Sequence, residues 1–82
     1  MQYRIEIDKR AVKFILKQPK PQQERLLRAI YRLPAAGDIK SMRGYEGYYR
    51  LRVGDYRVIY TVNDSVLLVR VIEIGNRGDV YK

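Results

Sequence analysis

The chain begins with a strand pattern and passes directly into a helical one. Tyr3, Ile5 and Ile7 alternate with polar neighbours, which is the period of a half-buried strand. Asp8 then stands where a helix N-cap is expected. Over residues 9–17, helical spacing separates an apolar side from a basic side and predicts an amphipathic helix. Its basic side consists of Lys9, Arg10, Lys13 and Lys17, and its apolar side of Ala11, Val12, Phe14, Ile15 and Leu16.

A second helix is expected after a connector that contains two prolines. Pro19 and Pro21 stop the first helix, because proline lacks an N–H group and restricts the residue before it. Residues 22–33 then return to helical spacing and end before Pro34. The inward side of this helix consists of Leu26, Leu27, Ile30 and Leu33. The two helices are therefore predicted to form an antiparallel hairpin.

The rest of the chain is predicted to form a loop and three strands. Residues 34–47 are rich in glycine and small residues and are expected to form the loop. The period then becomes two, which predicts strands at 48–53, 56–62 and 66–74, separated by the turn pairs Gly54-Asp55 and Asn63-Asp64. We expect a single α+β domain over residues 1–82, with the order β-α-α-β-β-β. Its four-stranded, mainly antiparallel sheet should carry the helical hairpin on one face.

The hairpin turn at Gly54-Asp55 fixes which side chains share a face of the sheet. With a two-residue turn, Arg52 lies directly opposite Arg57, and Arg50 lies on the same face two residues away. Like charges placed opposite each other oppose folding by roughly 0.2–1 kcal/mol per pair, so stability does not explain them. A bound phosphate does, because guanidinium groups match phosphate oxygens and stay charged. Arg70 is expected on the same face. The alternative to a phosphate site is that these arginines are simply solvated.

Charge and composition narrow the class of function. There are 17 Lys and Arg residues against 9 Asp and Glu, a formal net charge of +8, which favours a polyanionic partner such as nucleic acid. The basic side of the first helix is a candidate RNA contact or a solvated helix face. The absence of cysteine and histidine removes thiolate and imidazole chemistry and almost every zinc site, so no metal or cofactor is expected. No segment resembles a signal peptide or a membrane span, so we expect a cytoplasmic protein without a membrane partner.

The sequence resembles the RelE branch of the RelE/ParE toxin superfamily over nearly its whole length. The segments that carry the resemblance are, in order, Met42-Arg43-Gly44, Tyr49-Arg50-Leu51-Arg52, Asp55-Tyr56-Arg57-Val58-Ile59-Tyr60, and Ile74-Gly75-Asn76-Arg77 followed by Asp79-Val80-Tyr81. The resemblance implies a toxin of a type II toxin–antitoxin system that enters the ribosomal A site and cuts mRNA there. It also implies a cognate antitoxin, the ribosome and mRNA as partners.

The resemblance also implies roles for individual residues. Arg50 and Arg52 match a strand-borne basic pair, Arg57 a phosphate-binding arginine, Arg77 an arginine beside the leaving group, and Tyr81 a C-terminal tyrosine, and these five are the candidate catalytic residues. The candidate RNA-binding residues are Lys9, Arg10, Lys13, Lys17, Arg43 and Arg70. The family often has lysine at the basic pair, and arginine effectively cannot lose its proton. The general base therefore stays open, with Tyr81 as the side-chain candidate.

Two other functions remain open at this point. ParE toxins share the fold and inhibit DNA gyrase without cutting RNA. A non-toxic RNA-binding module would also use an arginine-rich face. Cleavage by attack of the RNA 2′-OH on the scissile phosphate is the function that the resemblance favours.

Overall fold

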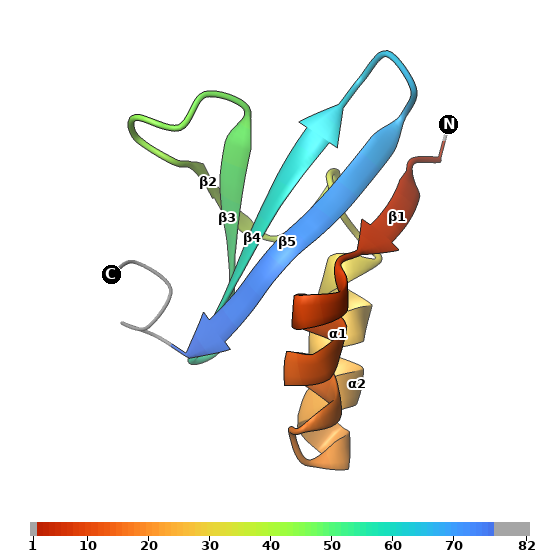
Figure 1. The fold of residues 1–82 in the computed structure, drawn as a ribbon, viewed down its shortest axis with the longest axis vertical. Coiled ribbons are helices and arrows are strands. Elements are labelled where there is room, and N and C mark those ends of the chain that lie inside the picture. Colours follow the sequence, from red (N-terminus) through yellow and green to blue (C-terminus); the bar gives the residue numbers. More distant parts are fainter. Residues whose placement is uncertain (1, 77–82) are drawn as a thin grey trace.

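The computed structural model describes residues 2–76, which form a mixed sheet flanked by two helices (Figure 1). The elements in chain order are β1 (Arg4–Ile7), α1 (Lys9–Leu16), α2 (Lys20–Ile30), β2 (Asp38–Ser41), β3 (Tyr48–Val53), β4 (Tyr56–Asn63) and β5 (Leu68–Asn76). In the sheet the strands follow the order β1-β5-β4-β3-β2. β1 pairs with β5 in parallel, and the other pairs are antiparallel. The predicted α+β class and element order are confirmed.

The expected strand count was wrong by one, because residues 34–47 are not all loop. β2 (Asp38–Ser41) pairs with β3 and gives the described chain five strands, where the sequence predicted four. Ile39 is the one apolar residue of this short strand. A strand that exposes most of its side chains at the edge of a sheet has little periodicity, and its pairing with β3 determines its conformation.

The second helix begins earlier than the prolines suggested. α2 starts at Lys20, and Pro21 lies in its first turn, where its missing N–H has no helical acceptor to lose. Only Pro19 separates the helices as predicted, and α2 ends at Ile30 instead of residue 33. Asp8 occupies the N-cap position of α1, but its carboxylate accepts no capping hydrogen bond and instead binds Arg70 at 2.9 Å.

The turn before the last strand is longer than the expected Asn63-Asp64 pair. β5 begins at Leu68, two residues later than predicted, and runs to Asn76. The connection uses Leu67 at a φ of 52°, and the Asn63 side chain accepts a hydrogen bond from the Ser65 backbone N–H at 3.0 Å. A local side-chain bond of this kind stabilises a wider turn than the two-residue form.

The core lies between the helices and one face of the sheet. Leu26 and Ile30 of α2 are fully buried, as are Val58 and Val71 of the facing strands. The expected apolar side of α1 is only partly correct: Ala11 and Ile15 are buried, whereas Val12 and Leu16 are exposed. The remaining buried core residues are Leu33, Leu51, Val53, Tyr60, Val69 and Ile74. The alternation of β3 and β4 predicts that one face of these strands packs on the helices, and all seven residues of that face belong to this core or pack against it: Tyr49, Leu51, Val53, Tyr56, Val58, Tyr60 and Val62.

Tyr60 makes the core sensitive to high pH. It is 1% exposed, its ring stacks on Tyr49 with centroids 5.6 Å apart, and burial followed by the nearby Tyr49 raises its pKa from 10.0 to about 12. Between pH 10 and 12 the unfolded chain therefore loses this proton while the folded chain keeps it. The free energy of unfolding should fall over this window by about 3 kcal/mol at most from this group. In urea titrations, Tyr60→Phe should lose less stability than the wild type between pH 10 and 12, and parallel losses would contradict the assignment.

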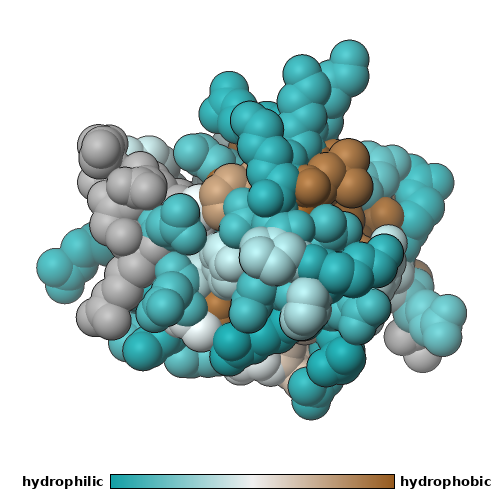
Figure 2. All heavy atoms as spheres, turned by 90° about the horizontal axis from the view of Figure 1, so that it is seen from below, coloured by the Kyte–Doolittle hydropathy of each residue, from teal (hydrophilic) through white to brown (hydrophobic). Residues whose placement is uncertain are grey.

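The molecular surface is dominated by polar side chains. The face shown in Figure 2 is largely hydrophilic, with small hydrophobic patches between charged side chains. Within residues 2–76, neither helix is long or apolar enough to span a membrane.

Candidate nucleic-acid interface

Three arginines meet on the sheet face opposite the helices. Arg52 of β3 pairs directly with Arg57 of β4, as the two-residue turn predicted, and Arg50 pairs with Ile59 one position along the same face. Arg52 is exposed, while Arg50 and Arg57 are half-buried. Gly75 lies opposite Arg57 on β5 and contributes no side chain there. The strands therefore hold three guanidinium groups together at the β3–β4 turn end of the sheet.

The short strand β2 extends this basic surface. Lys40 pairs with Arg50, and Asp38 pairs with Arg52. Together with Arg57, these side chains line a cavity of about 100 Å³, which we call the arginine cavity. Among the described residues that line it, four are cationic and one, Asp38, carries a carboxylate. Lys40 and Asp38 were missed from the sequence, because residues 34–47 were interpreted as a loop.

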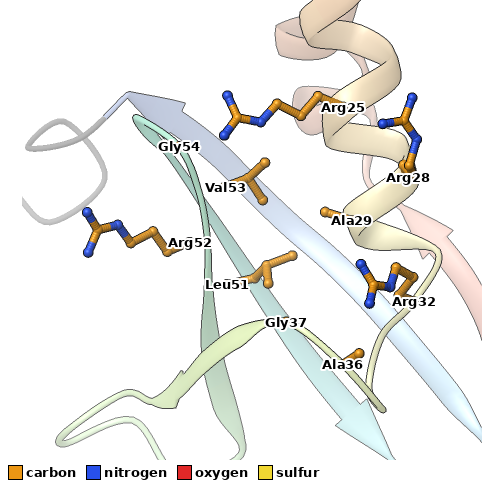
Figure 3. A pocket seen from close by; sticks show the side chains of 10 residues that line it. All are labelled: Arg25, Arg28, Ala29, Arg32, Ala36, Gly37, Leu51, Arg52, Val53 and Gly54. Carbon is orange, nitrogen blue, oxygen red and sulfur yellow. The ribbon is translucent and has the colours of Figure 1, made fainter.

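A second basic hollow lies on the other side of β3. The groove between α2 and β3 has a volume of about 300 Å³, and Figure 3 shows Arg25 and Arg28 of α2, with Arg32 just beyond the end of this helix, along one rim. Leu51 and Val53 point into this groove, whereas Arg52 points away from α2 to the opposite side of the sheet (Figure 3). The arginine cavity therefore lies on the side of β3 away from α2, and the α2–β3 groove, which Arg52 also borders, has an apolar floor on the other side.

Two of the candidate RNA-binding arginines form ion pairs. Arg70 pairs with Thr61 on β4, which places it on the same face as Arg57. Its Nε donates to Asp8 at 2.9 Å, and this hydrogen bond with the adjacent Asp8 charge raises the pKa of Arg70. Arg10 lies 3.8 Å from the carboxylate of Glu73, with its side chain 77% exposed. Both arginines therefore lie toward the β1–β5 side of the sheet, away from the arginine cavity.

The remaining candidates lie on separate parts of the described surface. Lys9, Lys13 and Lys17 are all exposed, but α1 packs beside β5, and these lysines do not line the arginine cavity. Arg43 is exposed in the connection between β2 and β3. Arg77 and Tyr81 lie outside the described residues, so their roles stay predictions.

The arginine cavity has the chemistry of an anion site. Guanidinium groups stay charged at every working pH and offer paired N–H donors that match phosphate oxygens. In addition, partial burial of Arg50 and Arg57 strengthens their field, because it excludes water on one side. Within residues 2–76, no cluster of three acidic side chains could hold a metal ion. Side chains of three adjacent strands are therefore arranged in a way that suits an anion such as phosphate.

Comparison with known proteins identifies relatives along the whole chain. A family model described as the ParE toxin of the type II toxin–antitoxin system parDE matches residues 5–81. The toxin RelE3 of Methanocaldococcus jannaschii is 50% identical over 45 residues, which are 54% of this chain and 48% of that relative. The match to RelE3 therefore spans about half the length of that toxin.

Two further relatives match over nearly their full length. The putative toxin RelE1 of M. jannaschii is 30% identical over 90 residues, covering 100% of this chain and 98% of the relative. Among solved structures, the archaeal RelE–RelB complex from Pyrococcus horikoshii OT3 contains a chain with 32% identity and a TM-score of 0.78. That match covers 96% of this chain and 99% of the other.

Proposed function

Because the chain belongs to the ParE toxin family of type II toxin–antitoxin systems, we propose that it is a RelE-type endoribonuclease that cleaves mRNA in the ribosomal A site. Arg50, Arg52 and Arg57 bind the scissile phosphate in the arginine cavity. Arg77 acts beside the leaving group, and Tyr81 is the side-chain candidate for the base. The protein acts in the cytoplasm, where translating ribosomes are found.

The pairing of Arg52 with Arg57 is the observation that supports this proposal most strongly. Two like charges held opposite each other cost stability, and both belong to strands whose register is fixed by a tight turn. Lys40 and Arg50 add two more cations beside them. An anion with several oxygen atoms removes this repulsion and accepts hydrogen bonds from both strands, and the phosphate of RNA is such an anion.

The proposed reaction needs charge stabilisation more than it needs strong acids or bases on the protein. The RNA 2′-oxygen forms a bond to the scissile phosphorus as its proton passes to a base, and the bond to the 5′-oxygen of the next nucleotide breaks. The departing 5′-oxygen takes up a proton, which leaves a 2′,3′-cyclic phosphate and a 5′-hydroxyl end. Negative charge builds up on the phosphorane oxygens, where preorganised donors lower the barrier by roughly 3–4 kcal/mol each.

Cleavage is expected to depend on the ribosome. The described residues offer arginines for the phosphate but no histidine or cysteine as a base, so the ribosome should supply geometry or groups that free RNA lacks. In a translation extract with the purified protein, primer extension should detect cuts within codons of translated mRNA. The same mRNA without ribosomes should stay intact. Equal cleavage with and without ribosomes would refute this dependence.

Inhibition of DNA gyrase is the second candidate function, because the matching family model is that of the ParE toxin. A supercoiling assay with purified gyrase separates the two. If the protein abolishes supercoiling at concentrations that leave translated mRNA intact, it is a gyrase inhibitor and the nuclease proposal is wrong. Intact supercoiling together with codon-specific cuts would support it.

We also propose that a cognate antitoxin covers the arginine cavity with an acidic or helical segment. An exposed cluster of four cations attracts carboxylates, and the solved relative from P. horikoshii is a complex of RelE with RelB. Co-expression with the adjacent gene should restore growth and yield a stable complex. Lys40→Glu and Arg52→Glu, each as a single reversal of charge, should weaken the complex about tenfold or more.

The matched control for this prediction is Arg28→Glu in the α2–β3 groove. This arginine is also exposed but lies on the other side of β3 (Figure 3). If Arg28→Glu weakens the complex and the Lys40 and Arg52 reversals do not, the antitoxin occupies the groove instead of the cavity.

A further inference from the structure

Two exposed tyrosines contact each other where the connection from β2 enters β3: Tyr45 lies in the connection, and Tyr48 is the first residue of β3. Tyr45 is 60% exposed and Tyr48 is 40% exposed. Their ring centroids lie 6.3 Å apart with the planes at 68°, an edge-to-face contact. The connection projects from the sheet on the side away from α1 and α2 (Figure 1). In contrast, Tyr49 and Tyr60, which also form a ring pair, pack against the core.

Backbone hydrogen bonds hold the two tyrosines in place. The Tyr45 N–H donates to the Met42 carbonyl and the Tyr48 N–H to the Tyr45 carbonyl, each at 3.1 Å. Gly44 and Gly47 have φ angles of 82° and 83°, which other residues rarely adopt, and they allow two successive turns. The loop thus holds a pair of aromatic rings at a defined position while leaving much of their surface in water. Core packing does not account for Tyr45, which is 60% exposed and is not one of the residues packed against the hydrophobic core.

Tyr48 belongs to the same sheet face as the arginines. Side chains alternate along β3, so Tyr48, Arg50 and Arg52 point to one side, and the half-buried Tyr49 points to the other. Residues two apart on a strand are separated by roughly 7 Å, which is comparable with the spacing of successive phosphates along a single RNA strand. A nucleotide bound with its phosphate at Arg50 therefore places a base near Tyr48.

One of these two tyrosines lies next to the cationic side chains along the same strand, because Tyr48 is two residues from Arg50 on β3. Aromatic rings beside cationic side chains are the usual means of binding single-stranded RNA: the cations bind phosphates and the rings stack on bases. A protein partner would also bind exposed tyrosines, but the place of Tyr48 on the strand that carries Arg50 and Arg52 favours a nucleotide.

We propose that Tyr45 and Tyr48 form a stacking platform for one unpaired nucleobase of the RNA whose phosphate lies in the arginine cavity. This inference rests on the proposed function and names the contact that positions the nucleotide next to the bound phosphate. The platform binds any base through its π-face, so it contributes affinity and position more than sequence preference.

The test measures binding to an RNA that cannot be cleaved. Fluorescence anisotropy would follow a labelled single-stranded hexamer with 2′-O-methyl sugars, together with six versions that each lack one base. For the wild type, removal of the base at one position should weaken binding roughly fivefold or more, the lower end for a single stacked base. In Tyr48→Ala and Tyr45→Ala, the complete hexamer should bind correspondingly more weakly, and the penalty for the missing base should shrink to less than about twofold.

Conservative and matched variants complete the design. Tyr48→Phe keeps the ring and should keep the penalty, and Tyr31→Ala removes an equally exposed tyrosine from the end of α2 and should leave binding unchanged. Each penalty is a ratio measured on one protein preparation, so a partly unfolded sample does not alter it. A penalty in Tyr48→Ala equal to that in the wild type, or no penalty at any position in the wild type, would overturn the proposal.

The same variants separate failure of the platform from failure of the proposed function. No step of the binding assay requires cleavage or a ribosome. If removal of one base weakens binding to the wild type but the protein cuts no translated mRNA, the nuclease proposal is wrong and the base-binding site remains supported. If Tyr45→Ala and Tyr48→Ala weaken binding to a copurifying protein partner but leave RNA binding unchanged, the tyrosines belong to a protein interface and the stacking proposal is wrong.

Discussion

Replacing Arg57 with alanine is expected to lower the single-turnover rate of mRNA cleavage by roughly 100- to 1,000-fold while changing ribosome affinity by less than about threefold. Arg57 lines the arginine cavity from the central strand β4, opposite Arg52 and beside the open position at Gly75. Its charge acts mainly on the phosphorane, which exists only in the transition state, so the rate suffers more than binding does. Single-turnover cleavage and ribosome binding would be measured on the same preparations.

Arg28→Ala is the matched control for this loss. It removes an exposed arginine from the far side of the sheet and should leave the cleavage rate unchanged. A loss of rate in both variants would point to a general effect of net charge on ribosome encounter and not to catalysis. If Arg57→Ala lowers affinity as much as rate, Arg57 binds the ground state, and its catalytic role is wrong.

Arg52 allows catalysis to be separated from folding. Arg52→Gln removes one of two like charges that face each other across β3 and β4, which should raise the free energy of unfolding by roughly 0.2–1 kcal/mol. The same change should lower the cleavage rate. A gain in stability with a loss of activity is what a functional charge cluster predicts, whereas a merely solvated face predicts the gain in stability without any loss of activity.

The sequence predicted the centre of the candidate site because a tight turn determines it. Gly54-Asp55 permits a two-residue connection, and this alone sets Arg52 against Arg57 and directs the intervening apolar side chains toward the helices. Strong alternation in β3 and β4 made their bounds predictable. The resemblance drawn from the short motifs is confirmed by the family match over residues 5–81 and by the RelE relatives.

The edge of the site was not predictable from local pattern. β2 has a single apolar residue, Ile39, and its conformation depends on pairing with a strand ten residues further along the chain, so Lys40 and Asp38 were missed. The signal that was present is the alternation of Asp38, Ile39 and Lys40 after Gly37, which is too short to distinguish a strand from a loop.

Ion pairs between segments far apart in the chain could not be predicted from the sequence either. Arg10 and Arg70 were expected to contact RNA, yet each lies against a carboxylate, Glu73 and Asp8 respectively. These contacts arise because β1 pairs in parallel with β5 and brings the start of α1 beside the last strand. The sequence shows where charged residues lie and how apolar residues repeat, but it does not show which segments become neighbours across a sheet.

The second large effect is expected at Tyr81, which the family resemblance makes the candidate base and which lies outside the described residues. A general base contributes roughly 100- to 10,000-fold to the rate of a proton-transfer step. Free tyrosine loses its proton near pH 10, but neighbouring positive charges favour the phenolate and lower that pKa. The chain supplies such charges in abundance, with a formal net charge of +8.

Tyr81→Phe should therefore lower the single-turnover rate by about 100-fold or more, because it removes the hydroxyl and keeps the ring. Ribosome affinity and thermal stability should stay close to those of the wild type. Lys13→Ala, on the exposed side of α1, serves as a contrasting variant. It should weaken ribosome binding and reduce the salt dependence of that binding by roughly 0.7 in log–log slope if Lys13 contacts single-stranded RNA. Full activity of Tyr81→Phe would exclude the hydroxyl as the base, and since arginine cannot take that role, the proton would then pass to a group of the ribosome.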